Sequence, residues 1–178
     1  CQTGQGKLVE LITRNILRDI PVGFSHHQKR QKSDYLSGLL ASGSDFIREL
    51  EAHPQLADRC FPSAFNQLGT LGGGNHFIEL QEDEKGELCV MLHSGSRNVG
   101  KQVCDYFNKL ARMLNERWQT GVLSSYQLAF LPVDDEAGQS YLRWMDMALN
   151  FARENRDLMK ERVKAIILRL VTKHTGFG

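Results

Sequence analysis

The apolar pattern near the C-terminus constrains the fold most. From about Glu136 to Lys173, apolar residues recur at a near-heptad spacing, which indicates a helix with one buried face. The residues of this stripe are Met145, Ala148, Ala152, Met159, Val163, Ile166 and Leu170. The sequence therefore predicts one long helix over this stretch, with ends that are defined to within a few residues.

Two further helices follow from the same kind of spacing. Residues 7–19 are predicted to be helical, and Pro21 ends this segment because proline disfavours a helical residue before it. A second pattern starts at Lys101. Its apolar face consists of Val103, Phe107, Leu110, Ala111 and Leu114. Residues 121–132 then form a connector with room for a short helix.

The segment between these two helices carries start and stop signals. Ser44 with Asp45 can cap a helix that runs to about Ala57. Proline interrupts helices, so we expect a break near Pro54 and a loop around Pro62.

A β-hairpin is predicted in the middle of the chain. Residues 77–80 and 87–93 have strand-like composition, and residues 82–86 between them have the composition of a turn. One hairpin flanked by helices, among them a long C-terminal helix, places the chain in the α+β class. We expect residues 1–178 to form a single domain.

Composition excludes several classes of protein. The chain has 178 residues, of which 41% are apolar and 24% charged, which is typical of a globular domain and not of a disordered tail. The 22 Lys and Arg nearly balance 21 Asp and Glu, so overall charge predicts neither a nucleic acid nor a membrane partner. Residues 1–33 are locally basic.

The chain starts without Met or a signal peptide, so we expect a central piece of a longer protein.

The four cysteines are too few for a disulfide scaffold. They lie at positions 1, 60, 89 and 104 and form no Cys-x-x-Cys pair. We expect them to be reduced and packed as small apolar residues, with Cys89 inside a strand and Cys104 inside a helix. This usage favours an intracellular, cytoplasmic protein. No apolar run approaches the roughly 20 residues that span a bilayer, so we expect no membrane partner.

Four glycines within residues 69–74 directly precede Asn75 and His76. Glycine allows a close backbone approach to a ligand and positive φ angles. The run matches neither common nucleotide-binding fingerprint, because no Gly-Lys-Ser/Thr follows and no helix begins there. A tight turn before a strand is the simpler interpretation, but the polar pair after the run favours a functional site.

His76 and His93 each lie at the edge of a predicted strand, 17 residues apart in the sequence. A hairpin can bring the two imidazoles together, and such a pair suits Zn, Mn, Fe or Ni. Further ligands must come from elsewhere. Two hydrogen-bonded histidines in a protein core remain the alternative.

Small polar residues and an arginine follow His93 directly, where a strand leads into a helix. Ser94, Ser96 and Arg97 can form an anion cradle, because backbone N–H groups at a helix N-terminus favour phosphate and arginine adds a bidentate contact. The alternative is that a serine only caps the helix. A Ser-His nucleophile is disfavoured because the Gly-x-Ser-x-Gly elbow is missing.

Two smaller features have a functional and a structural interpretation each. Asn155 and Arg156 interrupt the long apolar stripe, so they either point inward toward a polar site or lie on a solvated face. His26 and His27 precede a basic stretch that either contacts RNA phosphates or is a solvated loop. Its basic residues are Lys29, Arg30 and Lys32.

Three motifs together resemble the RtcB family of RNA ligases. They are Leu68–Glu79, Met91–Arg97 and Ala152–Arg156, the last fitting a family pattern Ala-x-x-Asn-Arg. The resemblance implies a mixed α+β fold of its own kind and a ligase that uses Mn²⁺ and GTP. It also implies RNA substrates whose 2′,3′-cyclic phosphate or 3′-phosphate ends are joined to 5′-hydroxyl ends through a guanylylated histidine.

The resemblance assigns roles residue by residue. His76 and His93 look like metal ligands, one for each of two manganese ions, and Asn75 looks like a contact to the guanylate phosphate. The residues that would line the phosphate-binding region are Ser94, Ser96 and Arg97.

The chain also departs from the family pattern. The Asp-x-Gly-Cys-Gly-Met motif, which supplies a bridging thiolate and a carboxylate ligand, is missing, and Cys1 does not replace it. A later Asn-Cys-His-His-Asn segment and the histidine that accepts GMP are missing too. Asn98 stands where Gly is usual and Gly73 where Thr is frequent, which suggests a divergent branch concerned with RNA repair.

The leading hypothesis is thus a central fragment of an RtcB-like ligase that is catalytically silent alone. The rival hypothesis is a non-catalytic RNA- or protein-binding module that kept the scaffold. A small metallohydrolase would require more metal ligands than this chain offers.

Overall fold

The computed structural model describes residues 4–122 and 124–175, and its contacts divide the chain into two compact units. The first unit consists of Cys1–Gln31, Asn66–Gly95 and Arg153–Gly178. The second consists of Lys32–Phe65 and Ser96–Ala152. The long helix α6 (Glu136–Thr175) contributes to both units. A single domain over the whole chain stays a prediction.

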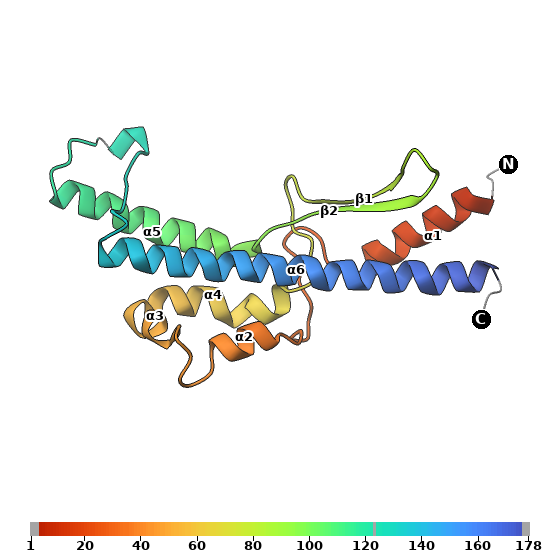
Figure 1. Ribbon diagram of the computed structural model, residues 1–178, viewed down its shortest axis with the longest axis horizontal. Helices are drawn as coiled ribbons and strands as arrows, with labels where there is room; N and C mark the ends of the chain where they lie inside the picture. Colours follow the sequence, from red (N-terminus) through yellow and green to blue (C-terminus); the bar gives the residue numbers. More distant parts are fainter. Residues whose placement is uncertain (1–3, 123, 176–178) are drawn as a thin grey trace. The chain divides into compact units, whose positions relative to one another are not determined.

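The first unit packs helix α1 (Gly4–Asp19) and a hairpin along the C-terminal part of α6 (Figure 1). Isoleucines four residues apart on α1 face valine, isoleucine and leucine on α6, as expected of two apolar helix stripes. The buried residues of this core are Ile12, Ile16, Ile20, Leu71, Met159, Val163, Ile166 and Leu170. The predicted helix over residues 7–19 is confirmed.

The predicted hairpin is also confirmed. Strands β1 (Phe77–Glu82) and β2 (Leu88–His93) pair antiparallel, from Phe77 opposite His93 to Glu82 opposite Leu88. Alternate residues of a strand point to opposite faces. One face therefore packs Ile78, Leu80 and Leu92 against the core of the first unit, while the other face carries Phe77 and His93.

The second unit is helical. It contains α2 (Asp34–Leu39), α3 (Ile47–Ala52), most of α4 (Pro54–Gln67), α5 (Arg97–Arg117), the short 3₁₀ helix η1 (Ser124–Tyr126) and the start of α6. Its largest fully buried side chains are Leu36, Leu56, Val99, Phe107, Trp144, Met147 and Phe151. The short helix expected in the connector is present as η1.

The segment from Ser33 to Gln67 differs from the prediction in two respects. Helix α2 was not predicted, although Ser33 caps it by accepting a hydrogen bond from the Leu36 amide at 2.8 Å. Pro62 lies inside α4 and not in a loop. A proline inside a helix removes one hydrogen bond, but burial of α4 residues such as Leu56 and Ala64 against the second unit offsets this loss.

The expected cap of the next helix is wrong. Phe46, not Ser44 or Asp45, is the N-cap residue of α3, and its side chain makes no capping hydrogen bond. The Ser44 hydroxyl instead donates to the Leu39 carbonyl at 2.6 Å. Ser44 thus has the hydrogen-bonding capacity of a cap residue, but its hydroxyl stabilises the turn after α2.

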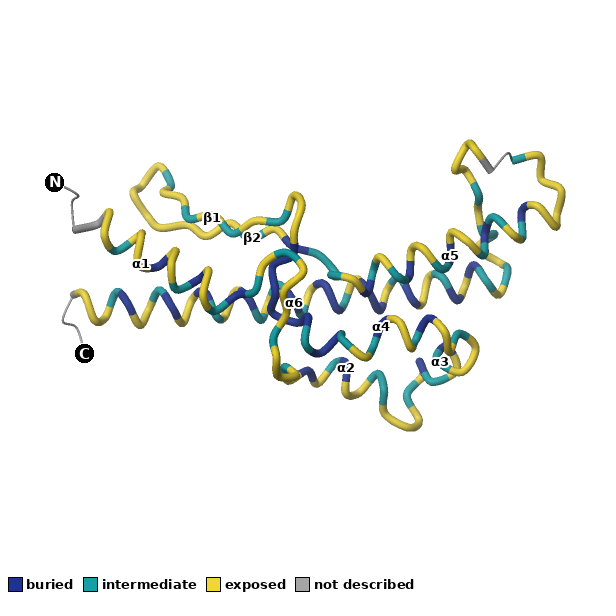
Figure 2. Tube along the Cα trace, turned by 180° about the vertical axis from the view of Figure 1, so that it is seen from behind, coloured by how far each residue is buried: buried dark blue, intermediate teal, exposed yellow. Residues whose placement is uncertain are grey.

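The long C-terminal helix is confirmed. Buried positions recur along α6, as Figure 2 shows, and Trp144, Met147 and Phe151 extend the predicted stripe. Helix α5 starts at Arg97, four residues before the expected Lys101. Within residues 4–122 and 124–175, no helix combines the length and the apolar character needed to cross a bilayer.

The expectation that the cysteines are packed is correct for Cys60 only. Burial raises the pKa of the Cys60 thiol to about 12. Cys89 and Cys104 are free thiols too, but they are exposed, which corrects the prediction. Cys89 pairs with Gln81 on the outward face of the hairpin, so its position in a strand did not imply burial. Cys1 lies outside the described residues.

Candidate functional site

The hairpin brings His76 and His93 together at its open end. The register places Phe77 directly opposite His93, so His76 lies beside the last residue of β2. The centroids of the two imidazole rings are 5.8 Å apart, with 54° between the ring planes. Two histidines 17 residues apart in the sequence are therefore neighbours because of strand pairing.

The two histidines have different surroundings. His93 is exposed and stacks on the ring of Phe77, with 5.6 Å between centroids. His76 is half-buried, and a Cβ built on Gly95 would lie 3.6 Å from its Nε2 atom. Asn75, directly before His76, is exposed. The site is thus open to solvent on the side of His93 and Asn75.

The donor set fits part of a metal site. Metal–nitrogen bonds of imidazole are about 2.1 Å long, and paired catalytic ions lie about 3.5–4 Å apart. Rings 5.8 Å apart can therefore bind one ion or two neighbouring ions. Over residues 4–122 and 124–175, no three His, Cys, Asp or Glu side chains gather around one point. His76 and His93 would therefore need further ligands to complete a site.

The glycine run is anchored on one side. The Gly72 carbonyl accepts a hydrogen bond from the Gly23 amide, and the Pro21 carbonyl accepts one from the Leu71 amide, both at 2.9 Å. Gly72 and Gly74 have φ angles of 97° and 73°, which favour glycine. The glycine run thus leads the chain from the hydrogen-bonded residues Leu71 and Gly72 through a turn to Asn75 and His76.

Asn155 points inward, which decides between the two sequence-based interpretations. Its side chain is fully buried in the first unit and contacts Thr70, Ser94 and Gly95. Arg156 follows it and donates from Nη1 to the Ser94 carbonyl at 3.2 Å. Asn155 and Arg156, which interrupt the apolar stripe of α6, therefore face Ser94 and Gly95, the residues that follow the hairpin.

The predicted phosphate-binding residues divide between the units. In the first unit, the buried Ser94 hydroxyl donates to the Leu71 carbonyl at 2.7 Å. In the second unit, Ser96 is the N-cap residue of α5 without a side-chain capping bond, and Gly100 leaves space for its hydroxyl. Arg97 has a φ angle of 54°, rare for a residue with a side chain, and burial lowers its pKa. The phosphate-binding roles of Ser94, Ser96 and Arg97 stay predictions.

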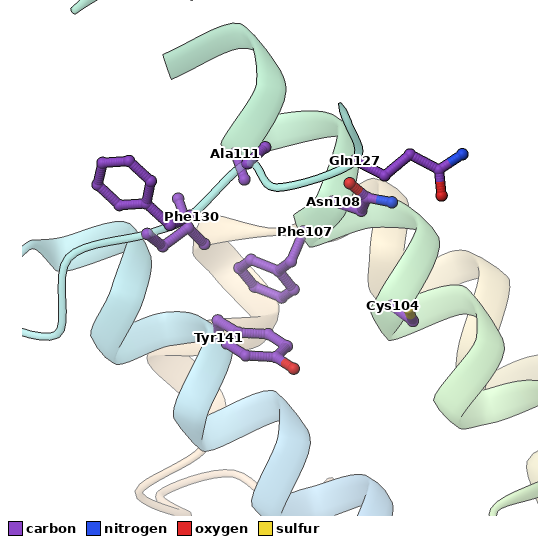
Figure 3. Close-up of a pocket in the computed structure, with 9 residues that line it drawn as sticks. Cys104, Phe107, Asn108, Ala111, Gln127, Phe130 and Tyr141 are labelled. Carbon is purple, nitrogen blue, oxygen red and sulfur yellow. The ribbon is translucent and has the colours of Figure 1, made fainter. Parts of the chain in front are cut away.

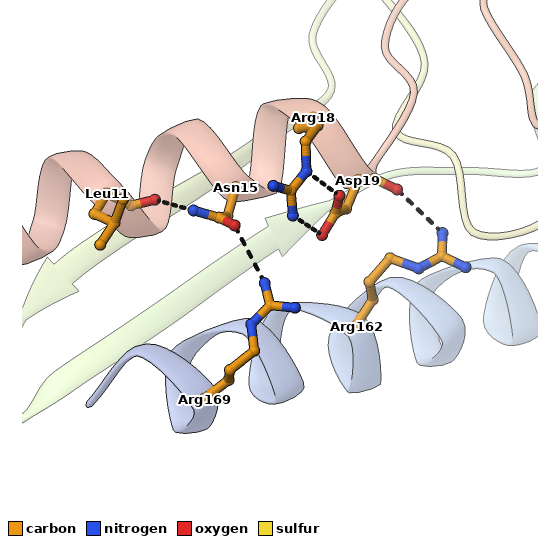
Figure 4. A network of polar contacts seen from close by, with 6 residues as sticks. All are labelled: Leu11, Asn15, Arg18, Asp19, Arg162 and Arg169. Carbon is orange, nitrogen blue, oxygen red and sulfur yellow. Dashed lines mark hydrogen bonds and ion pairs between the residues drawn. The ribbon is translucent and has the colours of Figure 1, made fainter. Parts of the chain in front are cut away.

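A cluster around Arg162 was missed at the sequence level. Its Nη1 atom lies 2.8 Å from Nε2 of His27, 3.3 Å from the Gly69 carbonyl and 3.4 Å from the Asp19 carbonyl. Figure 4 shows the contact with Asp19 at the end of α1. His27 thus packs inward against α6, while His26 is exposed. No local pattern links these residues, because they are 135 positions apart in the sequence.

The cluster makes stability depend on pH. The pKa of His27 is lowered from its ordinary 6.5, mainly because burial disfavours the charged ring and also because Arg162 repels it, while the Gly69 carbonyl opposes this. The unfolded chain then binds more protons than the folded chain below about pH 6.5, so the free energy of unfolding falls as the pH decreases. We expect His27→Gln to flatten this decrease between pH 7 and 5, measured by urea unfolding.

The exposed neighbour provides the control for this measurement. His26→Gln should flatten the pH profile of the unfolding free energy less than His27→Gln does, because His26 is exposed and hydrogen-bonds the nearby Phe24 carbonyl at 3.1 Å. A residual slope is expected from His53, whose pKa is also lowered by burial. An unchanged slope in His27→Gln would contradict the role of His27.

The second unit has a pocket of its own, of about 340 Å³ (Figure 3). It is lined by residues of α5, the connector and α6, among them Phe107, Phe130, Tyr141 and Cys104. None of the predicted metal-binding or phosphate-binding residues lines it. The pocket therefore carries none of the side chains assigned to metal or phosphate binding.

Comparison with known proteins gives consistent matches. The family model of the tRNA-splicing ligase RtcB matches residues 2–177. The RNA-splicing ligase RtcB of Escherichia coli K12 is 39% identical over 131 residues, which cover 70% of this chain. The protein of the same name from Mycobacterium tuberculosis is 34% identical over 127 residues, or 63% of the chain. The tRNA-splicing ligase RtcB of Methanococcus maripaludis is 28% identical over 196 residues, or 89% of the chain.

The relatives are much longer than this chain. The matched segments span 32% of the Escherichia coli protein, 29% of the Mycobacterium tuberculosis protein and 40% of the Methanococcus maripaludis protein. The chain therefore corresponds to less than half of each of these relatives.

Proposed function

Because this chain belongs to the RtcB family of ligases, we propose that its protein joins RNA 2′,3′-cyclic phosphate or 3′-phosphate ends to 5′-hydroxyl ends. The reaction uses GTP and Mn²⁺ and serves tRNA splicing or RNA repair. This chain supplies two metal ligands and part of the guanylate pocket. The histidine that becomes guanylylated belongs to a segment outside these 178 residues.

The observation that carries the proposal is the meeting of His76 and His93 at the open end of the hairpin. The rings are 5.8 Å apart, and each histidine belongs to a family-like motif. In the observed register Phe77 is opposite His93, so His76, directly before β1, meets the ring of His93 at the open end of the hairpin.

Each proposed ligand has a defined task. His76 and His93 each hold one Mn²⁺ ion, with further ligands from other segments. The ions supply Lewis-acid stabilisation of the charge on phosphate groups. Asn75, exposed beside His76, donates its side-chain amide to the guanylate phosphate.

The phosphate-binding part of the proposal rests on Arg97. Its guanidinium remains cationic despite the lowered pKa and can bind a phosphate through two parallel hydrogen bonds. Ser94 and Ser96 are proposed to contribute to phosphate binding with Arg97, as their place in the same motif suggests. The free thiols of Cys60, Cys89 and Cys104 support a cytoplasmic location, since reducing compartments keep thiols unpaired.

A ligation assay tests the proposal. We expect the full-length protein with Mn²⁺ and GTP to join RNA carrying a 3′-phosphate to RNA carrying a 5′-hydroxyl end, and to lose this activity when either is omitted. The 178-residue chain alone should form no covalent adduct with labelled GTP. RNA binding without ligation by the full-length protein would instead favour a non-catalytic module, and an adduct on the short chain would show that the accepting histidine lies within it.

A further inference from the structure

We propose that Asn155 is a positioning residue that holds the segments carrying His76 and His93 at the spacing that metal binding requires. The inference rests on the proposed function of the two histidines. It assigns to a buried carboxamide of α6 a task that neither histidine can perform itself, because His93 ends the hairpin and His76 directly precedes it.

The Asn155 carboxamide joins two segments that are distant in the sequence. On one side, its Oδ1 atom accepts from the Thr70 amide at 3.1 Å, and its Nδ2 atom lies 3.2 Å from the Thr70 carbonyl. On the other side, Nδ2 lies 3.1 Å from the Gly95 carbonyl and 3.2 Å from the Ser94 hydroxyl oxygen. One fully buried side chain thus contacts both segments.

These contacts lie close to both histidines. Thr70 begins the segment that runs through the glycines to His76, and Ser94 directly follows His93. The Ser94 hydroxyl also donates to the Leu71 carbonyl, which joins the same two segments a second time. Gly95, held by Asn155, is itself the backbone beside Nε2 of His76. The carboxamide therefore links the segment that leads to His76 with the segment that follows His93.

Aspartate cannot take over this role. A carboxylate keeps an acceptor for the Thr70 amide but has no N–H to donate. It would face the carbonyl oxygens of Thr70 and Gly95 without a proton between them. Buried acceptors that face each other without a donor are unfavourable.

A metal-binding measurement separates positioning from simple stabilisation. If Asn155 only stabilised the fold, Asn155→Ala would lower the melting temperature in EDTA but leave the Mn²⁺ affinity of the folded protein unchanged. If it positions the histidines, the Kd for Mn²⁺ rises by about 10–100-fold, the range found for residues that orient metal ligands. The readout is free Mn²⁺ detected by electron paramagnetic resonance in titrations of the full-length protein without GTP or RNA.

Two reference variants complete the design. Asn150→Ala is the matched control on the same helix, since the Asn150 side chain donates to Asp146, one turn away, at 3.0 Å; its Kd should equal that of the parent. In a His76→Ala/His93→Ala background, where Mn²⁺ binding at this site is expected to be lost, Asn155→Ala should cause no further loss of bound Mn²⁺, because residues acting through one another are not additive.

Each outcome decides between the proposals. A folded Asn155→Ala protein whose Kd lies within twofold of the parent overturns the inference, while loss of Mn²⁺ binding in His76→Ala would keep the proposed function intact. Unchanged Mn²⁺ binding in the double-histidine variant overturns both. If Asn155→Ala does not fold, Ser94→Ala takes its place: it removes one Asn155 contact and the Leu71 bond, and its Kd should rise more than twofold.

Discussion

Replacing either His76 or His93 by Ala in the full-length protein is expected to abolish Mn²⁺-dependent RNA ligation. Outer-shell partners of metal ligands contribute about 10–100-fold to activity, so loss of a ligand itself should lower the ligation rate by at least about 100-fold. The measurement is the initial rate of joining between a 3′-phosphate RNA end and a 5′-hydroxyl end at saturating GTP.

His174→Ala is the matched control for this experiment. His174 is an exposed histidine in the last turn of α6, and no role is assigned to it. Its removal should leave the rate unchanged. Undiminished ligation in His76→Ala or His93→Ala would refute the assignment of that histidine as a ligand. The two losses should be similar, because each histidine is proposed to hold one of two ions that act together.

The largest effect on stability is expected from Trp144→Ala. Trp144 is the largest fully buried side chain of the second unit, and its ring packs edge-on against Phe46 with 5.0 Å between centroids. Removing a buried aromatic ring leaves a cavity and costs about 3–5 kcal/mol. Because folded domains are stable by only about 5–15 kcal/mol, the urea midpoint should fall sharply.

The chain offers a second tryptophan for comparison. Trp118 follows α5 and is 39% exposed, so Trp118→Ala should change the unfolding free energy by less than about 1 kcal/mol. Both variants are compared with the parent by urea unfolding monitored by far-ultraviolet circular dichroism. A loss below about 1 kcal/mol in Trp144→Ala would contradict the packing of the second unit. Should that variant not fold, Trp144→Phe is expected to show a smaller loss of the same sign.

Helical periodicity and strand composition were enough to predict the main elements. The stripe from Met145 to Leu170 identified α6, and two segments of strand-like composition separated by a turn identified the hairpin. These predictions succeeded because, along a long buried face, apolar residues recur at the same spacing many times. The segment from Ser33 to Gln67 was less predictable. A short helix such as α2 depends on a single cap residue and on burial. In α4, burial outweighs the loss of the backbone hydrogen bond at Pro62.

The candidate site was predicted only in part. The motif around His76 and the motif around His93 were visible in the sequence, and local strand pairing brings them together. By contrast, the link between Asn155 and Thr70 joins residues 85 positions apart, and that between Arg162 and His27 joins residues 135 positions apart. Neither link leaves a local pattern, because side-chain contacts between distant elements depend on how those elements pack.

The amino-acid sequence by itself therefore determined the family and which residues are proposed for the site, since both follow from short contiguous motifs. Only the tertiary structure decided that Asn155 faces inward, that His27 packs against Arg162 and that Cys89 is exposed. The physical reason is that hydrogen-bond partners and burial are properties of surfaces in contact, and those surfaces exist only after α6 has packed against the segments around it.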